Sequence, residues 1–472
     1  MLYVNICVCV ILYMVWSYLF IKTYQLTGYR IKLFLTNIFE LNLAYGDKNK
    51  LVLTKRLCRF VLALAIVAIG LFFLVNYFVH NVFLRIFDCA LLFLFVPFVI
   101  AGVHYLLWPI EKLIKIMYVK RAKRKLGRLD IIKIGITGSY GKTSTKTILA
   151  TMLEKEYKVC ATPKSYNTEM GVTKTILSNL DDHDVFIAEM GARHRGDIET
   201  LTKLVKPSYG ILTTIGNQHI ETFGSTRCIE ETKNELPQNM PDDGVMVFNG
   251  DSQSTRRLYD RYSGEKYLTN SKDGYAYAEN VVIGPSGSKF DLVLNGARLP
   301  VKTRLLGNCN IHNIVTAAAM ASRLGITNQD LASAIAMLEP VPHRLEIVKN
   351  NFSTIIDDSY NCNIVGSSEA LDVLSRFEGL KIVVTPGIVE MGKEQSDVNF
   401  KLGAMIADVA DYIIIMNDTN KNYILSGAIS HNFPREKIYF AQTRKKQKEI
   451  LQLIMVKGAV VLFENDLPDN YR

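Results

Sequence analysis

The stretch "KIGITGSYGKTSTK", Lys133–Lys146, predicts how the central part of this chain folds. The run "DIIKIGIT" is typical of a buried strand, "GSYGK" of a tight turn and "TSTKTILATMLEKEY" of a helix. The amides of such a turn and the positive end of the helix dipole favour bound phosphate. Lys142 adds a positive charge, and the Thr143 hydroxyl suits Mg²⁺. The stretch therefore predicts a nucleotide-binding loop.

Glycine spacing separates this loop from the general P-loop, G-x-x-x-x-G-K-[ST], because Ile136 occupies the place of the first glycine. Further strands predicted at 184–191, 209–219 and 244–250 alternate with helical segments, which favours a mostly parallel sheet. Ligands of such sheets collect at the carboxyl ends of the strands. Glu189 and His219 fall at two such ends. Either side chain alone would more often be structural, but their shared position predicts Mg²⁺ ligands.

Charge is distributed unevenly along the 472 residues, whose formal net charge is +10. Residues 1–128 hold 17 Lys and Arg against 4 Asp and Glu, which leaves 38 against 41 in the remainder. A nucleic-acid surface belongs on a folded basic domain, so we expect no nucleic-acid partner. The eight cysteines are scattered without a CxxC pair, which argues against a disulfide framework or a zinc ribbon and fits a reducing compartment.

Three apolar stretches, 2–21, 60–79 and 89–108, each have about the ~20 residues needed to cross a bilayer core. We expect three transmembrane helices within a membrane region at 1–127 that ends in the basic linker "KRAKRKLGR". Basic segments at 22–59 and 109–128 orient such a protein with its catalytic part in the cytoplasm. The sequence thus predicts a multi-pass protein of a bacterial cell membrane.

Several motifs, in order, resemble the Mur ligase family. They are "GITGSYGKTSTK", "SYNTEMGVTKTIL" (165–177), "AEMGARHRGDIETLTKLVKPSYGILTTIGNQHIETFGS" (188–225), "ETKNEL" (231–236), "GNCNIHNIVTAAAMA" (307–321), "PVPHRLEIV" (340–348), "IDDSYNCN" (356–363) and "GIVEMGKE" (387–394). The spacing of the glycines in the loop is the one that this family uses. Within the family, the likeness is greatest to the branch that joins D-Ala-D-Ala to the muramyl tripeptide.

The resemblance implies an α/β protein with an ATP-binding central domain at 128–341 and a Rossmann-like C-terminal domain at 342–472. It implies a ligase that activates a carboxylate as an acyl phosphate, which the amine of an amino acid or dipeptide then attacks. The implied cofactors are ATP, two Mg²⁺ ions and a carbamylated lysine. The implied substrates are a muramyl peptide and an amino acid or dipeptide, D-Ala-D-Ala by the likeness.

Site residues are carried over motif by motif. The resemblance assigns the ATP phosphates to Gly138, Ser139, Tyr140, Gly141, Lys142, Thr143 and Ser144. It assigns the metal ions to Thr143, Glu189, His219 and Lys233, with Lys233 carbamylated. It assigns a place near the γ-phosphate to Asn167, adenine to Asn310 and Asn313, and closure of the C-terminal domain over the nucleotide to Arg344 and Asp358. Lys142, Lys233, His219 and Asn167 are the expected catalytic residues. Taken singly, Asn313 could cap a helix, Arg344 could form a surface ion pair and Lys233 could be solvated.

Two departures from the family leave alternatives open. The membrane region stands where the family has a domain for the UDP-sugar, which suggests a lipid-linked acceptor. Asn399 stands near a position where the family usually has His, so the identity of the amine is less secure than the reaction type. The competing hypotheses are a membrane-associated poly-glutamate ligase of the same superfamily and a membrane-anchored P-loop ATPase without ligation.

Overall fold

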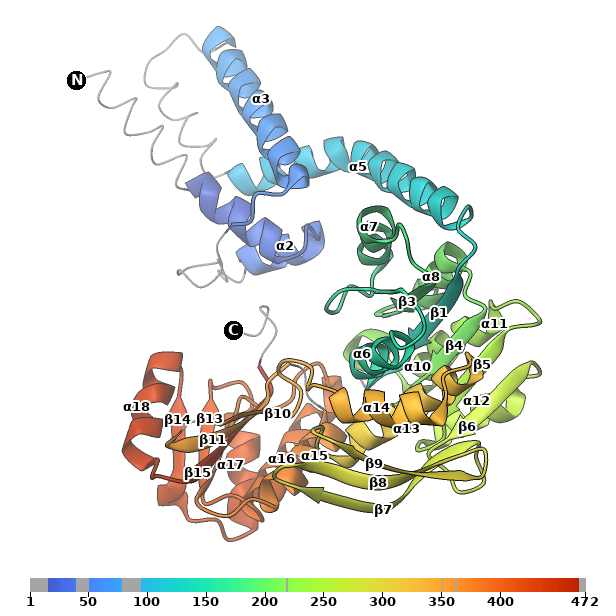
Figure 1. The fold of residues 1–472 in the computed structure, drawn as a ribbon. Helices are drawn as coiled ribbons and strands as arrows, with labels where there is room; N and C mark the ends of the chain where they lie inside the picture. The colour runs from blue at the N-terminus through green and yellow to red at the C-terminus, as the bar shows by residue number, and fades with distance from the viewer. Residues whose placement is uncertain are drawn as a thin grey trace. The chain divides into compact units, whose positions relative to one another are not determined.

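The computed structural model describes residues 16–39, 51–78, 95–217, 220–349, 351–360 and 363–466. The chain divides into two compact units. One comprises residues 1–118 and 468–472, and the other comprises residues 119–467 (Figure 1).

The first unit contains helices packed around aromatic side chains such as Tyr24, Phe34 and Phe60, all nearly inaccessible to solvent. The helices with defined bounds are α2 (Ile31–Phe39), α3 (Lys55–Phe78) and α5 (Val96–Leu126), of which α5 continues into the second unit. Large apolar side chains of α3, including Leu62, Ile66 and Phe73, are exposed.

The prediction of three transmembrane helices is wrong. Among the helices that the structure describes, none is long and apolar enough to cross a membrane. Charged side chains occupy part of both long helices: α5 carries Glu111 and Lys112 near its middle and basic residues in its last turn, and Lys55, Arg56 and Arg59 lie in the first turns of α3. The predicted stretch 2–21 is described only from residue 16 onward, and the stretch 89–108 only from residue 95 onward, where α5 begins at Val96. The expected multi-pass localisation and the transmembrane part of the expected fold class are therefore also wrong.

The second unit contains two sheets. The larger sheet has the strand order β2-β3-β1-β4-β5-β6-β7-β8-β9 and is parallel from β2 to β7, whereas β7, β8 and β9 pair antiparallel. The strands are β1 (Ile132–Thr137), β2 (Val159–Ala161), β3 (Val185–Glu189), β4 (Tyr209–Leu212), β5 (Val245–Asn249), β6 (Glu265–Thr269), β7 (Ala276–Gly284), β8 (Gly287–Leu294) and β9 (Ala297–Thr303).

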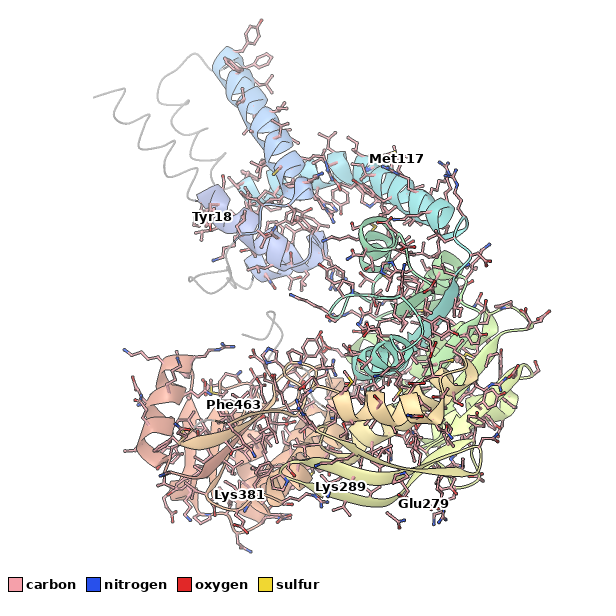
Figure 2. The ribbon with its side chains drawn as sticks, viewed as in Figure 1. Tyr18, Met117, Glu279, Lys289, Lys381 and Phe463 are labelled. Atoms are coloured by element: carbon pink, nitrogen blue, oxygen red, sulfur yellow. The ribbon has the colours of Figure 1, made fainter. Side chains whose placement is uncertain are left out.

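The smaller sheet has the order β10-β11-β15-β12-β13-β14, and only its edge strand β10 runs antiparallel. Its strands are β10 (Glu346–Lys349), β11 (Ser353–Asp358), β12 (Lys381–Thr385), β13 (Tyr412–Met416), β14 (Ile438–Ala441) and β15 (Ala459–Glu464). Figure 2 marks two of these strands, with Lys381 at the amino end of β12 and Phe463 near the carboxyl end of the adjacent β15. The expected α/β architecture with parallel sheets is confirmed. The expected boundaries of 128–341 and 342–472 stay a prediction.

Helices lie between and beside these strands. Those associated with the larger sheet are α6 (Lys142–Leu153), α7 (Glu169–Asn179), α8 (Asp197–Val205), α9 (Ile220–Phe223), α10 (Thr226–Lys233), α11 (Glu235–Gln238), α12 (Gln253–Arg261), α13 (Asn308–Arg323) and α14 (Asn328–Met337). Those associated with the smaller sheet are α15 (Ile364–Ser375), α16 (Gln395–Ala407), α17 (Lys421–Ser430) and α18 (Arg444–Ile454), with short 3₁₀ turns η1 (Gly392–Glu394) and η2 (Arg435–Lys437).

Alternation along β3 shows how the sequence builds two faces of the larger sheet. Val185 and Ile187 pack into the core that also contains side chains of α6 and α13. Phe186 and Ala188 pack into the opposite core, with side chains of α7, α8 and α12. Successive residues of a strand point to opposite faces, so a strand buried on both sides is apolar throughout. At the carboxyl edge of this sheet, between the two helix layers, β1 ends at Thr137 and is followed by the loop that leads to α6.

Candidate active site

The loop from β1 to α6 requires its two glycines. Gly138 and Gly141 have φ values of 146° and 79°, which side chains rarely adopt. A Cβ atom on Gly138 would lie 1.9 Å from Thr213 Oγ1, and one on Gly141 would lie 2.4 Å from Asn313 Oδ1. The loop is therefore enclosed by the end of β4 and by α13.

Neighbouring groups hold this loop in place. The amides of Ser139 and Tyr140 donate to Thr214 O at 2.8 and 3.3 Å, and the Thr213 hydroxyl donates to Tyr140 O at 2.6 Å. Ser139 Oγ also donates to Gly216 O at 2.9 Å. Thr143 and Ser144 are buried in the first turn of α6. These contacts join the loop to the segment that follows β4.

Lys142 folds back over the loop. Its Nζ donates to Gly138 O and to Ser139 O, each at 2.8 Å. Burial lowers the pKa of Lys142 to about 8, assisted by the positive charge of Arg344 and opposed by Glu189. A bound phosphate would offer this ammonium stronger, charged acceptors than two carbonyl oxygens. The arrangement fits the predicted phosphate role of Lys142.

Glu189 lies at the carboxyl end of β3 and is 1% exposed. Its Oε2 accepts from Lys146 Nζ at 2.9 Å, and its Oε1 accepts from Asn167 Nδ2 at 3.0 Å. Burial alone would raise the pKa of Glu189, but the charges of Lys146 and Lys142 hold it below its ordinary value. An ionised carboxylate beside a phosphate loop is suited to Mg²⁺. The structure thus brings together three predicted residues: Lys142, Asn167 and Glu189.

Lys146 is a residue for which the sequence analysis assigned no role. It is buried, forms the ion pair with Glu189 and also donates to Lys164 O. Burial lowers the pKa of Lys146, although Glu189 opposes that effect. Its spacing gave a usable signal, because residues four apart on a helix share one face and Lys146 follows Lys142 at that interval.

Helix α13 supplies Asn310 and Asn313, and both are buried. Asn313 Oδ1 accepts from Thr145 Oγ1 at 3.2 Å and lies against Gly141, whereas Asn310 Nδ2 donates to Leu306 O at 2.8 Å. Asn313 therefore contacts the phosphate loop itself. A direct role of the two asparagines in contacting adenine stays a prediction.

Lys233 ends α10 and is 3% exposed. Burial lowers its pKa well below the ordinary value, and the nearby charge of Lys142 adds to the effect, while Glu235 and Asp197 oppose it. The side chain is thus placed within electrostatic reach of the phosphate loop. His219, the other expected ligand of a second metal ion, lies outside the described residues.

Arg344 precedes β10, the edge strand of the smaller sheet, and Asp358 ends the adjacent strand β11. The guanidinium of Arg344 lies 4.6 Å from the centre of the Tyr360 ring, and its charge lowers the pKa values of Lys142 and Lys146. Asp358 Oδ1 accepts from the amide of Leu345 at 3.1 Å. Burial raises the pKa of Asp358 to about 6. A role of the two residues in closing the C-terminal domain over the nucleotide stays a prediction.

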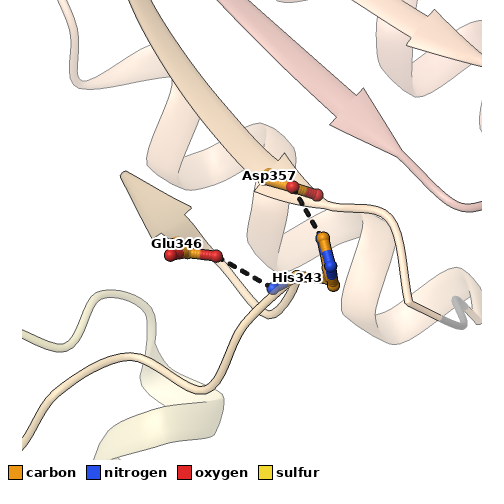
Figure 3. Close-up of side chains that lie close together, drawn as sticks. All are labelled: His343, Glu346 and Asp357. Carbon is orange, nitrogen blue, oxygen red and sulfur yellow. Dashed lines mark hydrogen bonds and ion pairs between the residues drawn. The ribbon is translucent and has the colours of Figure 1, made fainter. Parts of the chain in front are cut away.

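Figure 3 shows a second polar group, formed by His343, Glu346 and Asp357, of which the first two lie close to Arg344 in the sequence. His343 Nδ1 lies 2.8 Å from Asp357 Oδ2, and the His343 amide donates to Glu346 Oε2 at 3.1 Å. Glu346 and Asp357 are paired across β10 and β11. These ligand-type atoms lie within 4.8 Å of one another, and the His343 side chain is exposed. The contacts join the residue before Arg344 to the hairpin that follows it.

A phosphate loop at the carboxyl edge of a parallel sheet, with a buried carboxylate beside it, places the chain in the class of nucleotide-dependent α/β proteins. Residues 136–321 match the family described as the Mur ligase middle domain. The UDP-N-acetylmuramoyl-tripeptide--D-alanyl-D-alanine ligase of Bacillus subtilis (strain 168) is 27% identical over 347 residues, which are 73% of this chain and 75% of that protein. The enzyme of the same name from Mycobacterium leprae (strain TN) is 32% identical over 349 residues, 67% of each chain.

A solved structure agrees with these relatives. The crystal structure of MurF ligase from Thermotoga maritima in complex with ADP has a TM-score of 0.67 and 26% sequence identity, covering 75% of this chain and 80% of that one. The chain belongs to the Mur ligase family. Its match spans about two thirds to three quarters of the length of the two curated relatives above.

Proposed function

We propose that this chain is an ATP-dependent amide ligase of peptidoglycan precursor synthesis that joins D-Ala-D-Ala to a muramyl tripeptide. The observation that supports this most is the position of Lys142 and buried Glu189 around one phosphate loop. The names of the MurF-type relatives supply the substrates, and the ADP complex of the Thermotoga protein supports the nucleotide.

The chemistry explains the arrangement of charges. A carboxylate is a poor electrophile, so its oxygen first takes the γ-phosphoryl group of ATP, which yields an acyl phosphate and ADP. The amine then attacks the carbonyl carbon, phosphate leaves, and the nitrogen loses a proton as the amide forms. No protein nucleophile is needed, because the barrier comes from bringing two anions together. Lys142 and the loop amides offset that repulsion.

Magnesium fits the donors present. Thr143 and the ionised carboxylate of Glu189 offer oxygen ligands beside the loop, and His219 and a carbamylated Lys233 complete the predicted set for a second ion. The ions would neutralise phosphate charge. Lys146 forms an ion pair with Glu189, so its ammonium group already places a positive charge beside the carboxylate that would bind Mg²⁺.

Lys233 is suited to carbamylation. Because burial lowers its pKa well below the ordinary value, a larger fraction of the side chain is the neutral amine. The neutral nitrogen attacks CO₂, a proton is released, and an anionic carbamate results. A carbamate at this position would attract the Lys142 ammonium and would offer oxygen atoms to a metal ion.

The acceptor follows from the relatives once the transmembrane helices are set aside. A lipid-linked acceptor was inferred from those helices and loses that support. We propose the UDP-linked muramyl tripeptide named in the relatives. The test is to supply ATP, Mg²⁺, D-Ala-D-Ala and this acceptor to the full chain and to analyse the products by mass spectrometry. The proposal predicts the pentapeptide product. A product that forms only when glutamate replaces D-Ala-D-Ala in the mixture would favour the poly-glutamate alternative.

A further inference from the structure

The loop that follows β12 carries a contact between the two sheets' domains. Glu390 O accepts from the amide of Glu221 at 3.4 Å, and Glu390 Oε1 lies 3.8 Å from Arg193 Nη2. Gly392 also lies close to Glu221, since a Cβ atom built on it would be 3.8 Å from Glu221 Cα. Arg193 belongs to the loop that follows Glu189, and Glu221 to the helix that follows His219. The loop therefore meets both segments that lead away from the predicted metal ligands.

Three buried asparagines fix the backbone of this loop. Asn399 Oδ1 accepts from the amide of Ile388 at 2.8 Å, and its Nδ2 donates to Ile388 O at the same distance. Asn420 Nδ2 donates to Pro386 O at 3.1 Å and to Ile388 O at 3.2 Å. Asn465 Nδ2 donates to Gly387 O at 2.6 Å.

These bonds define the loop closely because each carboxamide is buried, and a buried polar group left unpaired is destabilising. Gly387 has a φ of 80°, and a Cβ atom there would lie 2.4 Å from Asn399 Oδ1. Glu390 itself has a φ of 63°, a conformation that is unusual for a residue with a side chain. The backbone that presents Glu390 is thus held by the interior of its own domain.

The contact matters because it joins two domains. An exposed ion pair inside one domain contributes little. Between two domains, however, the same small free energy shifts the equilibrium between separated and closed arrangements, and each 1.4 kcal/mol changes it about tenfold. The Glu390 side chain is 16% exposed and that of Arg193 is 51% exposed. The pair is therefore accessible enough to form and separate.

We propose that Glu390, presented by the asparagine-held loop, is a positioning residue whose contact with Arg193 favours the closed arrangement and thereby strengthens binding of the amine donor. This inference rests on the proposed function, in which the C-terminal domain brings the amine to an acyl phosphate formed on the central domain. The bonds described above for the phosphate loop run to Thr213, Thr214, Gly216 and the Lys142 side chain, so we expect variants of the pair to leave nucleotide binding unchanged.

The test uses the full chain and a matched control. Arg193→Ala and Glu390→Gln each remove the interdomain pair, whereas Arg195→Ala removes a pair with Glu231 that stays inside the central domain. We expect KM for D-Ala-D-Ala to rise about fivefold or more in the first two variants. We expect no further rise in the double variant, an unchanged Kd for MgADP and unchanged constants in Arg195→Ala. The charge exchange Arg193→Glu with Glu390→Arg should recover most of the lost affinity.

The outcomes separate this inference from the proposed function. If wild-type protein forms product and Arg193→Ala behaves like Arg195→Ala, the positioning role is overturned while the ligase activity stands. Effects of the two single variants that multiply in the double variant also overturn it, because residues that act through one contact are not additive. Wild-type protein that forms no amide at all overturns the proposed function itself.

Discussion

Lys146 Nζ lies 2.9 Å from Glu189 Oε2, and both side chains are almost completely buried, at 4% and 1% exposed. The ion pair places a protein cation against the carboxylate that is predicted to bind Mg²⁺. Metal binding therefore requires Lys146 to give up part of this contact or to share the carboxylate, whose second oxygen is already bonded to Asn167.

Breaking this ion pair from one side should be costly. Lys146→Met leaves a buried carboxylate without its cation, so we expect a loss of about 3–5 kcal/mol in the free energy of unfolding, and a smaller loss when Glu189→Gln is added. Chemical denaturation of the three proteins measures this. Lys158→Met is the control, because its pair with Asp182 is exposed and should change nothing measurable. Equal losses in Lys146→Met and Lys158→Met would contradict the role of burial.

Removal of the Lys142 ammonium should abolish turnover. Lys142→Ala deletes a charge that lies over the phosphate loop, and we expect the rate of product formation to fall by about 10²–10³-fold. The measurement is initial rate at saturating ATP. Lys155→Ala is the control and should keep the normal rate, because Lys155 follows the end of the same helix and its ammonium group donates to Ser333 Oγ. A Lys142→Ala enzyme within a few fold of wild type would show that another cation serves the phosphates.

Lys233 should react with CO₂. We expect a carbamate signal in ¹³C NMR when ¹³C-bicarbonate is added to the full chain, because the lowered pKa of Lys233 favours the neutral amine. The signal and most of the activity should be absent in Lys233→Ala and present in Lys203→Ala, whose lysine is exposed. Near-normal rates in Lys233→Ala would show that the carbamate has no role.

Asp358 should make stability depend on pH. Its pKa is raised from 3.8 to about 6, so the folded state binds the proton more tightly than the unfolded state does. The stabilisation is fully present below about pH 4 and is lost as pH rises toward 6. Asp358→Asn keeps an acceptor for the Leu345 amide and removes the charge, so its melting temperature should decline less over this interval. Parallel melting curves for both proteins from pH 4 to 7 would contradict the assignment.

The elements around the phosphate loop could be predicted because their signals are local. An apolar run that ends at Gly138 is enough to predict β1, and the helix starting at Lys142 follows from the residues after the turn. The expected strand at 209–219 is shorter in the structure, where β4 ends at Leu212 and the next residues bond the loop instead. The antiparallel strands β7 to β9 had no comparable motif.

Two residues show why the rest could not be predicted. The importance of Lys146 depends on Glu189, a partner brought near only by the pairing of β1 with β3. Asn399, which stands near a position where the family usually has His, is fully buried and bonds the backbone of Ile388 and Gln395, and these partners depend on long-range packing. What this residue means for the identity of the amine stays a prediction. Apolar character in residues 60–79 and 89–108 likewise predicted spans without showing where the helices begin and end.

The central claim is that this chain couples ATP cleavage to formation of one amide bond. The most direct measurement is simultaneous quantification of ADP, phosphate and amide when the full chain receives ATP, Mg²⁺, the UDP-linked muramyl tripeptide and D-Ala-D-Ala. We predict equal amounts of the three products and almost no phosphate when D-Ala-D-Ala is left out. Phosphate released at the full rate without the dipeptide, and no new amide with it, would contradict the account.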